Sequence, residues 1–255
     1  NELTVKANKR AFIFSKKDGQ LKGVSVDNRK INFANGPRFI GARRADRSLD
    51  QFYNHDDEKA KEKDRTYSEF PDAAVFTKLD VKEDGGNLVV TANYKLGNLD
   101  KAQWTINPSG ELALDYTYNF FGVVDLMGIR FDYPEDQVIS KRWLGAGPYR
   151  VWQNRIHGTQ YDVWENDYND PIPGETFTYP EFKGYFGDVS WMNIQTKEGT
   201  ISLTNETPDA YIGVYQPRDG RDRLLYTLPE SGISVLNVIP PVRNKVNSTD
   251  LCGPS

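Results

Sequence analysis

Alternation of apolar and polar residues is the strongest structural signal along the chain. It is clearest at residues 111–120, where the apolar positions are Leu112, Leu114, Tyr116, Tyr118 and Phe120. Because successive side chains of a strand point to opposite faces, a period of two residues predicts a β-strand with one buried face. The intervening positions include Glu111, Asp115, Thr117 and Asn119, which we expect to face water.

Turn-forming residues divide much of the remaining chain into segments of similar length. Examples are Lys17-Asp18-Gly19, Asp84-Gly85-Gly86 and Pro108-Ser109-Gly110. The strands predicted between such turns cover residues 11–15, 21–26, 74–83, 87–96, a stretch through Trp104 and Ile106, 111–120, 199–204, 211–215 and 232–238. Turns at this spacing are typical of an antiparallel sandwich, and no strand–helix alternation of a parallel barrel is visible.

Length, charge and cysteine content narrow the fold class and the partners. A chain of 255 residues can bury a large core without disulfides or a metal, and we predict one all-β domain over residues 1–255. The formal net charge of −4 argues against nucleic acid or a membrane surface as partner. The single cysteine, Cys252, excludes a disulfide within the chain. Residues 56–65 are highly charged and are expected to be a solvated helix or loop.

Aromatic and polar residues concentrate between residues 143 and 191. This stretch holds four of the five tryptophans, together with many glycines and prolines that indicate loops. A pyranose stacks its C–H bonds on an aromatic ring, while its hydroxyls bind carboxylate, amide and guanidinium groups. The stretch therefore favours a carbohydrate-binding surface, whose candidate residues are Tyr149, Arg150, Trp152, Asn154, Arg155, Trp164 and Glu181.

Packing alone is the competing explanation for these aromatic residues. Large aromatic side chains are mostly buried, so Trp143 and Trp191 are expected on strands in the core. Arg155 is equally suited to a structural ion pair. A structural or interaction domain with its aromatic side chains buried between sheets thus stays open as an alternative.

The same stretch resembles the C-terminal domain of family 2 glycoside hydrolases of the β-galactosidase type. That domain carries a W-x-G-x-G-P-x-x-N-Y-x-D-R segment. The matching residues here are Trp143, Gly145, Gly147, Pro148 and Arg155, with Trp152 at the tyrosine position. A second segment, P-Q-E-x-G followed by tryptophan, corresponds to Pro180, Gly184 and Trp191, with Glu181 one place early and Phe182 at the glutamate position. Arg150 and Asn154 depart from the pattern, and residues 39–47 retain little of the family's R-A-P-x-D-N-D stretch.

The resemblance implies a large antiparallel two-sheet supersandwich of the galactose mutarotase-like kind. In these hydrolases both catalytic glutamates belong to a separate parallel barrel, so this chain is expected to carry no catalytic residue. Its expected partners are the catalytic barrel of the same parent chain and a galactoside or polysaccharide fragment. Because the sequence starts at Asn1 without methionine, we expect it to be a piece of a larger glycoside hydrolase. A periplasmic or secreted location is what the resemblance suggests.

Two enzymatic alternatives rest on other residues. Hydrolysis by this chain alone would need a pair of carboxyl groups, and no spacing singles out a pair among Glu165, Glu175, Glu181 and Asp188. Sugar mutarotation needs a base and an acid, and the candidates are His55, His157 on an expected strand edge, and Glu181. No cofactor or metal site is predicted, although the acidic loop at residues 167–170 contains oxygens suited to calcium.

Overall fold

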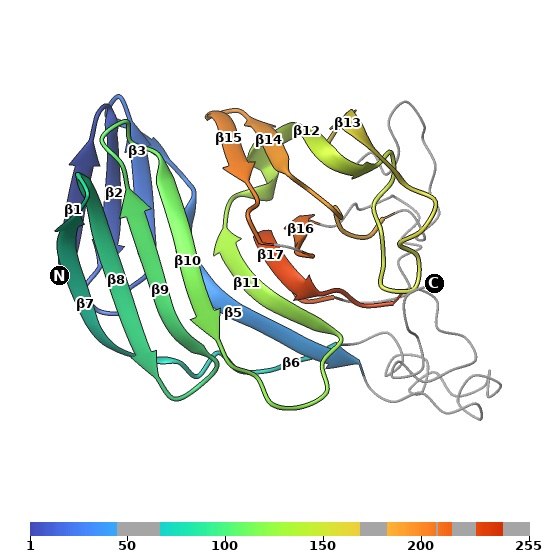
Figure 1. The fold of residues 1–255 in the computed structure, drawn as a ribbon, viewed down its shortest axis with the longest axis horizontal. Helices are drawn as coiled ribbons and strands as arrows, with labels where there is room; N and C mark the ends of the chain where they lie inside the picture. The colour runs from blue at the N-terminus through green and yellow to red at the C-terminus, as the bar shows by residue number, and fades with distance from the viewer. Residues whose placement is uncertain (45–66, 169–182, 208, 216–227, 242–255) are drawn as a thin grey trace. The chain divides into compact units, whose positions relative to one another are not determined.

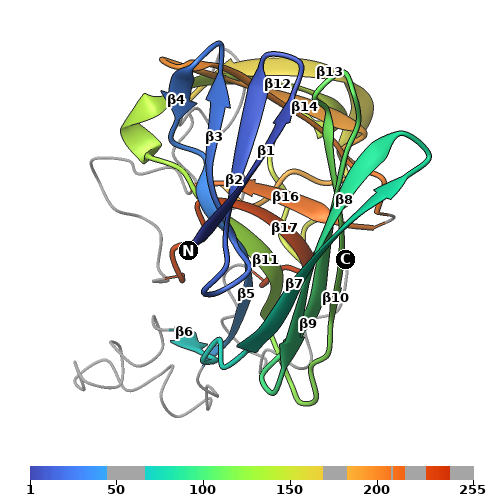
Figure 2. The ribbon, with the colours of Figure 1, turned by 90° about the vertical axis from the view of Figure 1, so that its left-hand side faces the viewer.

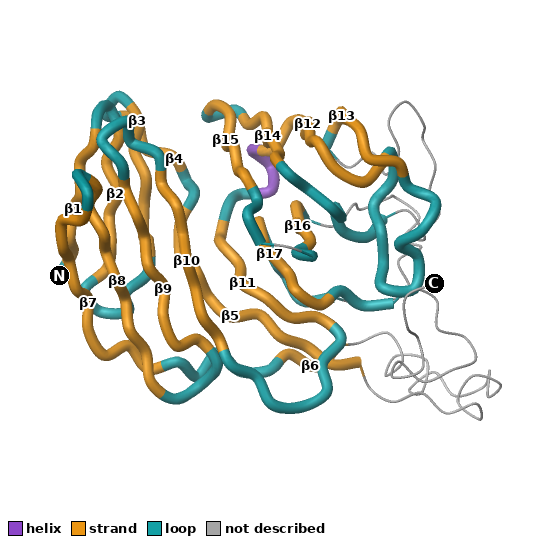
Figure 3. Tube along the Cα trace, in the orientation of Figure 1, coloured by secondary structure: helices purple, strands orange, loops and turns teal. Residues whose placement is uncertain are grey.

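The chain folds almost entirely into antiparallel β-strands. The computed structural model describes residues 1–44, 67–168, 183–207, 209–215 and 228–241. Within these ranges the strands form sheets of nine, four and four strands, and the helical element is one 3-10 turn, η1 (Glu135–Gln137) (Figure 3). The predicted all-β antiparallel fold is confirmed. The described residues include no helix of the length and apolarity that a membrane span requires.

The chain divides into two compact units, each assembled from separated segments. Unit 1 comprises Asn1–Ile40, Pro71–Gly122 and Ile129–Tyr133, and unit 2 comprises Gly41–Phe70, Val123–Gly128 and Pro134–Ser255. The strands β5 (Ala34–Arg44) and β11 (Leu126–Asp132) contribute residues to both units. No composition shift along the sequence marks this division, because neither unit is a continuous half of the chain.

Unit 1 contains most of the strands that the alternation predicts. Its strands are β1 (Glu2–Ala7), β2 (Arg10–Ser15), β3 (Leu21–Val26), β4 (Arg29–Ile31), β7 (Val75–Asp84), β8 (Asn87–Lys95), β9 (Leu99–Ile106) and β10 (Leu112–Tyr118), with parts of β5 and β11. The first three form a meander, and β7 to β10 form a second sheet in the order β10-β9-β8-β7 (Figures 1 and 2). The predicted hairpin at residues 11–26 and the four strands between residues 74 and 120 are confirmed.

Aromatic side chains fill the space between the two sheets of unit 1. The ring of Trp104 on β9 lies 6.0 Å from that of Phe14 on β2 and 6.0 Å from that of Phe131 on β11. On β10 the alternation appears as predicted, since Leu112, Leu114, Tyr116 and Tyr118 are half-buried while the intervening residues are exposed. Unit 1 is therefore a β-sandwich whose core is apolar and largely aromatic.

Unit 2 contains the stretch that the sequence predicts to be rich in loops. Its strands are β6 (Tyr67–Glu69), β12 (Val138–Gly147), β13 (Gln160–Asp167), β14 (Trp191–Thr196), β15 (Gly199–Thr204), β16 (Tyr211–Val214) and β17 (Ile233–Val238), with parts of β5 and β11. The predicted strands at 199–204, 211–215 and 232–238 correspond to β15, β16 and β17. Two sheets were predicted, and the sheet β13-β12-β14-β15 is an additional third one. Its strands β12 and β13 lie in the stretch that was expected to be mostly loop.

The core of unit 1 supports a prediction about stability. Trp104 is 3% exposed, and Trp104→Ala would leave a large cavity between Phe14 and Phe131. We expect the free energy of unfolding to fall by about 3–5 kcal/mol. Urea unfolding followed by circular dichroism measures this change. Phe121→Ala, at a fully exposed ring of the same unit, is the control and should change the value by less than about 0.5 kcal/mol. Equal effects of both substitutions would contradict the assignment of the core.

Candidate functional site

The loop at residues 148–159, here called the 148–159 loop, starts where β12 ends. It begins with a cis peptide bond between Gly147 and Pro148. The Arg155 N–H donates to the Trp152 carbonyl oxygen at 2.8 Å, and Val151 exchanges two backbone hydrogen bonds of 2.8 Å with Tyr185. The loop is thereby closed on itself and fixed to residues 183–190.

Glycines allow this close approach of the backbone. A β-carbon at Gly184 would lie 1.8 Å from the Val151 carbonyl oxygen, and one at Gly145 would lie 3.0 Å from two backbone oxygens. A β-carbon at Gly147 would lie 2.4 Å from the Trp164 ring. Gly145 and Gly147 therefore serve strand packing, although their sequence context predicts a loop.

Two of the predicted carbohydrate contacts, Arg150 and Trp152, lie in the core. Arg150 is 2% exposed and Trp152 is 0% exposed. The Trp152 ring packs edge-on against Tyr185 at 5.7 Å, and the Arg150 guanidinium lies 5.6 Å from the centre of the Phe186 ring. Neither side chain offers a surface to solvent in this structure, because both fill the corner under the loop.

Four other predicted contacts are accessible and gather around the loop. Tyr149, Asn154 and Trp164 are half-buried, and Arg155 is exposed. The Trp164 indole N–H donates to the Gln160 carbonyl oxygen at 3.3 Å, and its ring lies against Gly147. We call Tyr149, Asn154, Arg155 and Trp164 the loop surface. Glu181 lies outside the described residues, and the role of all seven candidates in carbohydrate binding stays a prediction.

A group of buried cations lies beside the loop, and the sequence did not predict it. Lys141 is fully buried, with its ammonium 5.0 Å from the centre of the Tyr168 ring, 6.0 Å from that of Phe186 and 3.3 Å from the Asp167 carbonyl oxygen. Lys183 is 2% exposed. Aromatic faces attract cations, which offsets part of the cost of burying them. The sequence offered one indication of this group. Lys141 is two residues before Trp143, so both side chains point to the same buried face of β12, where alternation predicts an apolar residue.

Tyr168 completes this group as a hydrogen-bond donor. Its hydroxyl donates to a carboxylate oxygen of Glu135 at 2.5 Å. Burial, together with this hydrogen bond to Glu135, raises the pKa of Tyr168. Tyr168 therefore stays protonated over the physiological range and holds Glu135 in place.

Of the candidate acid–base residues for the two enzymatic alternatives, the structure describes Glu165, Asp188 and His157, and all three are exposed. His157 lies on an exposed turn and not on the expected strand edge, while His55, Glu175 and Glu181 lie outside the described residues. Burial raises the pKa of Asp72 against the opposing effect of N–H groups of Ala74 and Phe39. Asp72 accepts backbone hydrogen bonds just before β7, which is a structural role.

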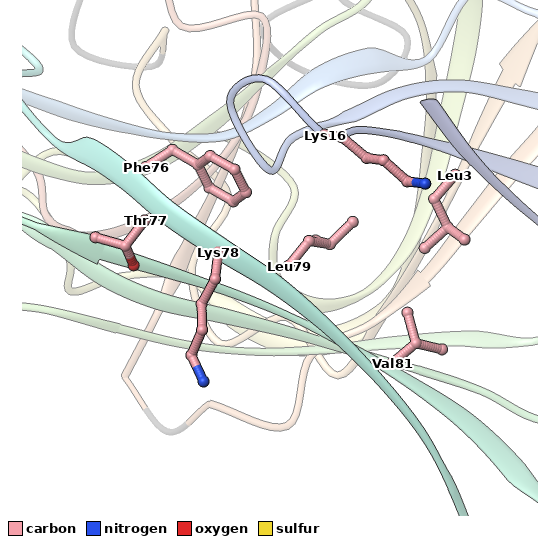
Figure 4. Close-up of a pocket in the computed structure, with 7 residues that line it drawn as sticks. All are labelled: Leu3, Lys16, Phe76, Thr77, Lys78, Leu79 and Val81. Carbon is pink, nitrogen blue, oxygen red and sulfur yellow. The ribbon is translucent and has the colours of Figure 1, made fainter. Parts of the chain in front are cut away.

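A cleft of about 410 Å³ opens between the end strands of the two sheets in unit 1. Its lining consists of Leu3, Lys16, Phe76, Thr77, Lys78, Leu79 and Val81. Leu79 points toward Leu3 and Lys16, whereas the Lys78 side chain extends away from them (Figure 4). Along β7, Lys78 pairs with Asp80 at 2.8 Å and Lys82 with Asp84 at 3.0 Å. The lining contains no carboxyl group that could act in glycoside hydrolysis.

Metal binding is not supported by a cluster of ligands in the part of the chain that the structure describes. Within it, no group of three or more His, Cys, Asp or Glu side chains is placed to hold an ion. Of the acidic loop at residues 167–170, only Asp167 and Tyr168 are described. Calcium binding there stays a prediction.

Comparison with known families decides the relationship. A family model described as β-galactosidase small chain matches residues 6–236. The chain belongs to this family. The match includes the 148–159 loop and all four strands of the sheet β13-β12-β14-β15. The β-galactosidase resemblance drawn from residues 143–191 is confirmed, and no curated protein matches the chain.

The contact between Gly184 and Val151 yields a prediction. In Gly184→Ala the new methyl group would overlap the Val151 carbonyl oxygen and separate the loop from residues 183–190. We expect a loss of about 3 kcal/mol in the free energy of unfolding, measured by urea denaturation. Gly23→Ala is the control, because its nearest neighbour would be a side-chain atom at 3.7 Å. Near-wild-type stability of Gly184→Ala would show that the loop does not depend on this approach.

Proposed function

We propose that the chain is the non-catalytic component of a β-galactosidase-type glycoside hydrolase and associates with a catalytic partner domain or subunit. The observation that carries this proposal is the match of residues 6–236 to a family described as a small chain. The described side chains packed under and beside the 148–159 loop support it, because the buried charged groups among them are Lys141, Arg150 and Lys183 and include no carboxyl pair.

The loop surface is the part of the chain that we propose to contact carbohydrate. Tyr149 and Trp164 supply aromatic rings, and Asn154 and Arg155 supply hydrogen-bond donors. Arg150 and Trp152 act from beneath by holding the loop in shape. A galactoside or a polysaccharide fragment suits this combination, and a periplasmic or secreted location would suit such a ligand.

Reconstitution tests the association. The chain would be co-expressed with the catalytic β-galactosidase chain of the same genome, or with the catalytic part of its own polypeptide if the coding sequence extends upstream. We expect no hydrolysis of nitrophenyl β-galactoside by this chain alone. We also expect co-elution with the partner and at least about tenfold more activity in the pair than in the partner alone. Hydrolysis by this chain alone, or a partner that neither binds it nor responds to it, would refute the proposal.

Substitution of the loop surface tests carbohydrate contact. In Trp164→Ala and Tyr149→Ala, the loss of an aromatic ring should weaken binding of β-galacto-oligosaccharides about tenfold each, measured by calorimetry. Phe121→Ala removes an exposed ring from unit 1 and should leave the affinity unchanged. If both loop variants bind as tightly as the wild type, the loop surface is not the contact.

A further inference from the structure

The sheet β13-β12-β14-β15 has one face in the core and one face in solvent. In an antiparallel sheet, residues directly opposite each other place their side chains on the same face. Lys141 lies opposite Ile194, and Trp143 lies opposite Met192. All four side chains are fully buried, so they mark the core face.

The other face carries a row of apolar side chains across three strands. Leu144 on β12 lies opposite Val163 on β13 and Trp191 on β14, and Trp191 lies opposite Thr204 on β15. Val163 is 41% exposed, and Leu144 and Trp191 are half-buried. Tyr161 lies two positions along β13 from Val163, opposite Ala146 on the same face. It is 59% exposed, and its hydroxyl forms a 2.6 Å hydrogen bond with the Ser190 hydroxyl. We call the solvent-facing side of the sheet β13-β12-β14-β15 the open face.

A row of hydrogen-bonding side chains runs beside the apolar row. Arg142 lies opposite Glu165 and Asn193, and Asn193 lies opposite Ser202. These residues are two positions along their strands from the apolar row, a separation of roughly 7 Å. Arg142 and Glu165 are 3.9 Å apart and compensate each other's charge. The next row consists of Ser140, Gln195 and Thr200, with the carboxylate of Asp167 at its β13 end, and Thr200 donates to Gln195 at 2.7 Å.

We propose that the open face binds a neutral oligosaccharide, with one pyranose ring on Trp191 and its hydroxyls bonded to Asn193, Arg142 and Glu165. The apolar side chains border a row of hydrogen-bonding side chains, which suits a narrow ligand that stacks on one side and hydrogen-bonds on the other. A protein interface would place a broader apolar area at its centre. The paired charges favour a neutral ligand over an anionic one.

This site differs from the loop surface. Trp164 and Val163 are adjacent on β13, so their side chains point to opposite faces of the sheet. The Trp164 ring lies against Gly147 at the base of the loop, whereas Val163 lies in the open-face row with Leu144 and Trp191. The inference therefore requires neither the loop surface nor a catalytic partner.

Indole N–H resonances of the five tryptophans separate the two sites in one NMR titration of the full chain. Each resonance would be assigned by a Trp→Phe variant, and the probes are galactotetraose, cellotetraose and xylotetraose, with oligogalacturonate as the anionic comparison. We expect at least one neutral probe to shift the Trp191 resonance saturably. The buried Trp104, Trp143 and Trp152 serve as internal controls and should not move.

Two variants test the contacts directly. Trp191→Ala lacks the Trp191 resonance, so its binding would be measured by calorimetry, and we expect it to be about tenfold weaker. Asn193→Ala should weaken the Trp191 titration severalfold, with an unchanged Trp143 resonance as proof of folding. Trp164→Ala is the matched control and should leave the Trp191 titration unchanged. A Trp191 resonance that no neutral probe moves would overturn the inference, as would one that responds only to the catalytic partner. Shifts confined to Trp164 would support the loop surface and refute the open face.

Discussion

The arrangement of unit 2 depends on a backbone contact that tolerates no side chain. At Gly184 the chain passes so close to the Val151 carbonyl oxygen that a methyl group would overlap it. This approach allows Val151 and Tyr185 to exchange hydrogen bonds, which brings Trp152 against Tyr185 and Arg150 over Phe186. The burial of Arg150 and Trp152 at the centre of the 148–159 loop follows from this contact.

The buried cations beside the loop are better explained by specificity than by stability. Removing an ammonium or guanidinium group from water is costly, and aromatic faces and carbonyl oxygens recover only part of that cost. An apolar side chain at Lys141 would pack at lower cost, but it would make no directional contact with the Asp167 carbonyl oxygen. A cation that must meet two rings and the Asp167 carbonyl oxygen fixes the position of β12 relative to its neighbours.

Local alternation predicted the meander strands and the all-β class because one face of each strand is buried and the other is wet. Glycine and proline content predicted loops over much of residues 143–191, and this was wrong for Gly145 and Gly147, which lie on β12, and for β13. The sequence alone does not distinguish a glycine that allows a close contact within a strand from a glycine that forms a turn. Trp152 illustrates a similar limit, because exposure of an aromatic ring depends on residues more than thirty positions away, such as Tyr185. The family motif was informative because it recorded the outcome of such long-range contacts.

The lysine–aspartate pairs along β7 affect how copies of this chain meet one another. An end strand exposes unpaired N–H and C=O groups that can template a strand from another molecule. The end strand β7 carries two ion pairs, Lys78 with Asp80 and Lys82 with Asp84. A strand added to β7 would remove water from the charged groups of both pairs. The alternating charges thus disfavour pairing of β7 with a strand of another molecule. The apolar cleft beside β7 can therefore stay accessible without promoting aggregation.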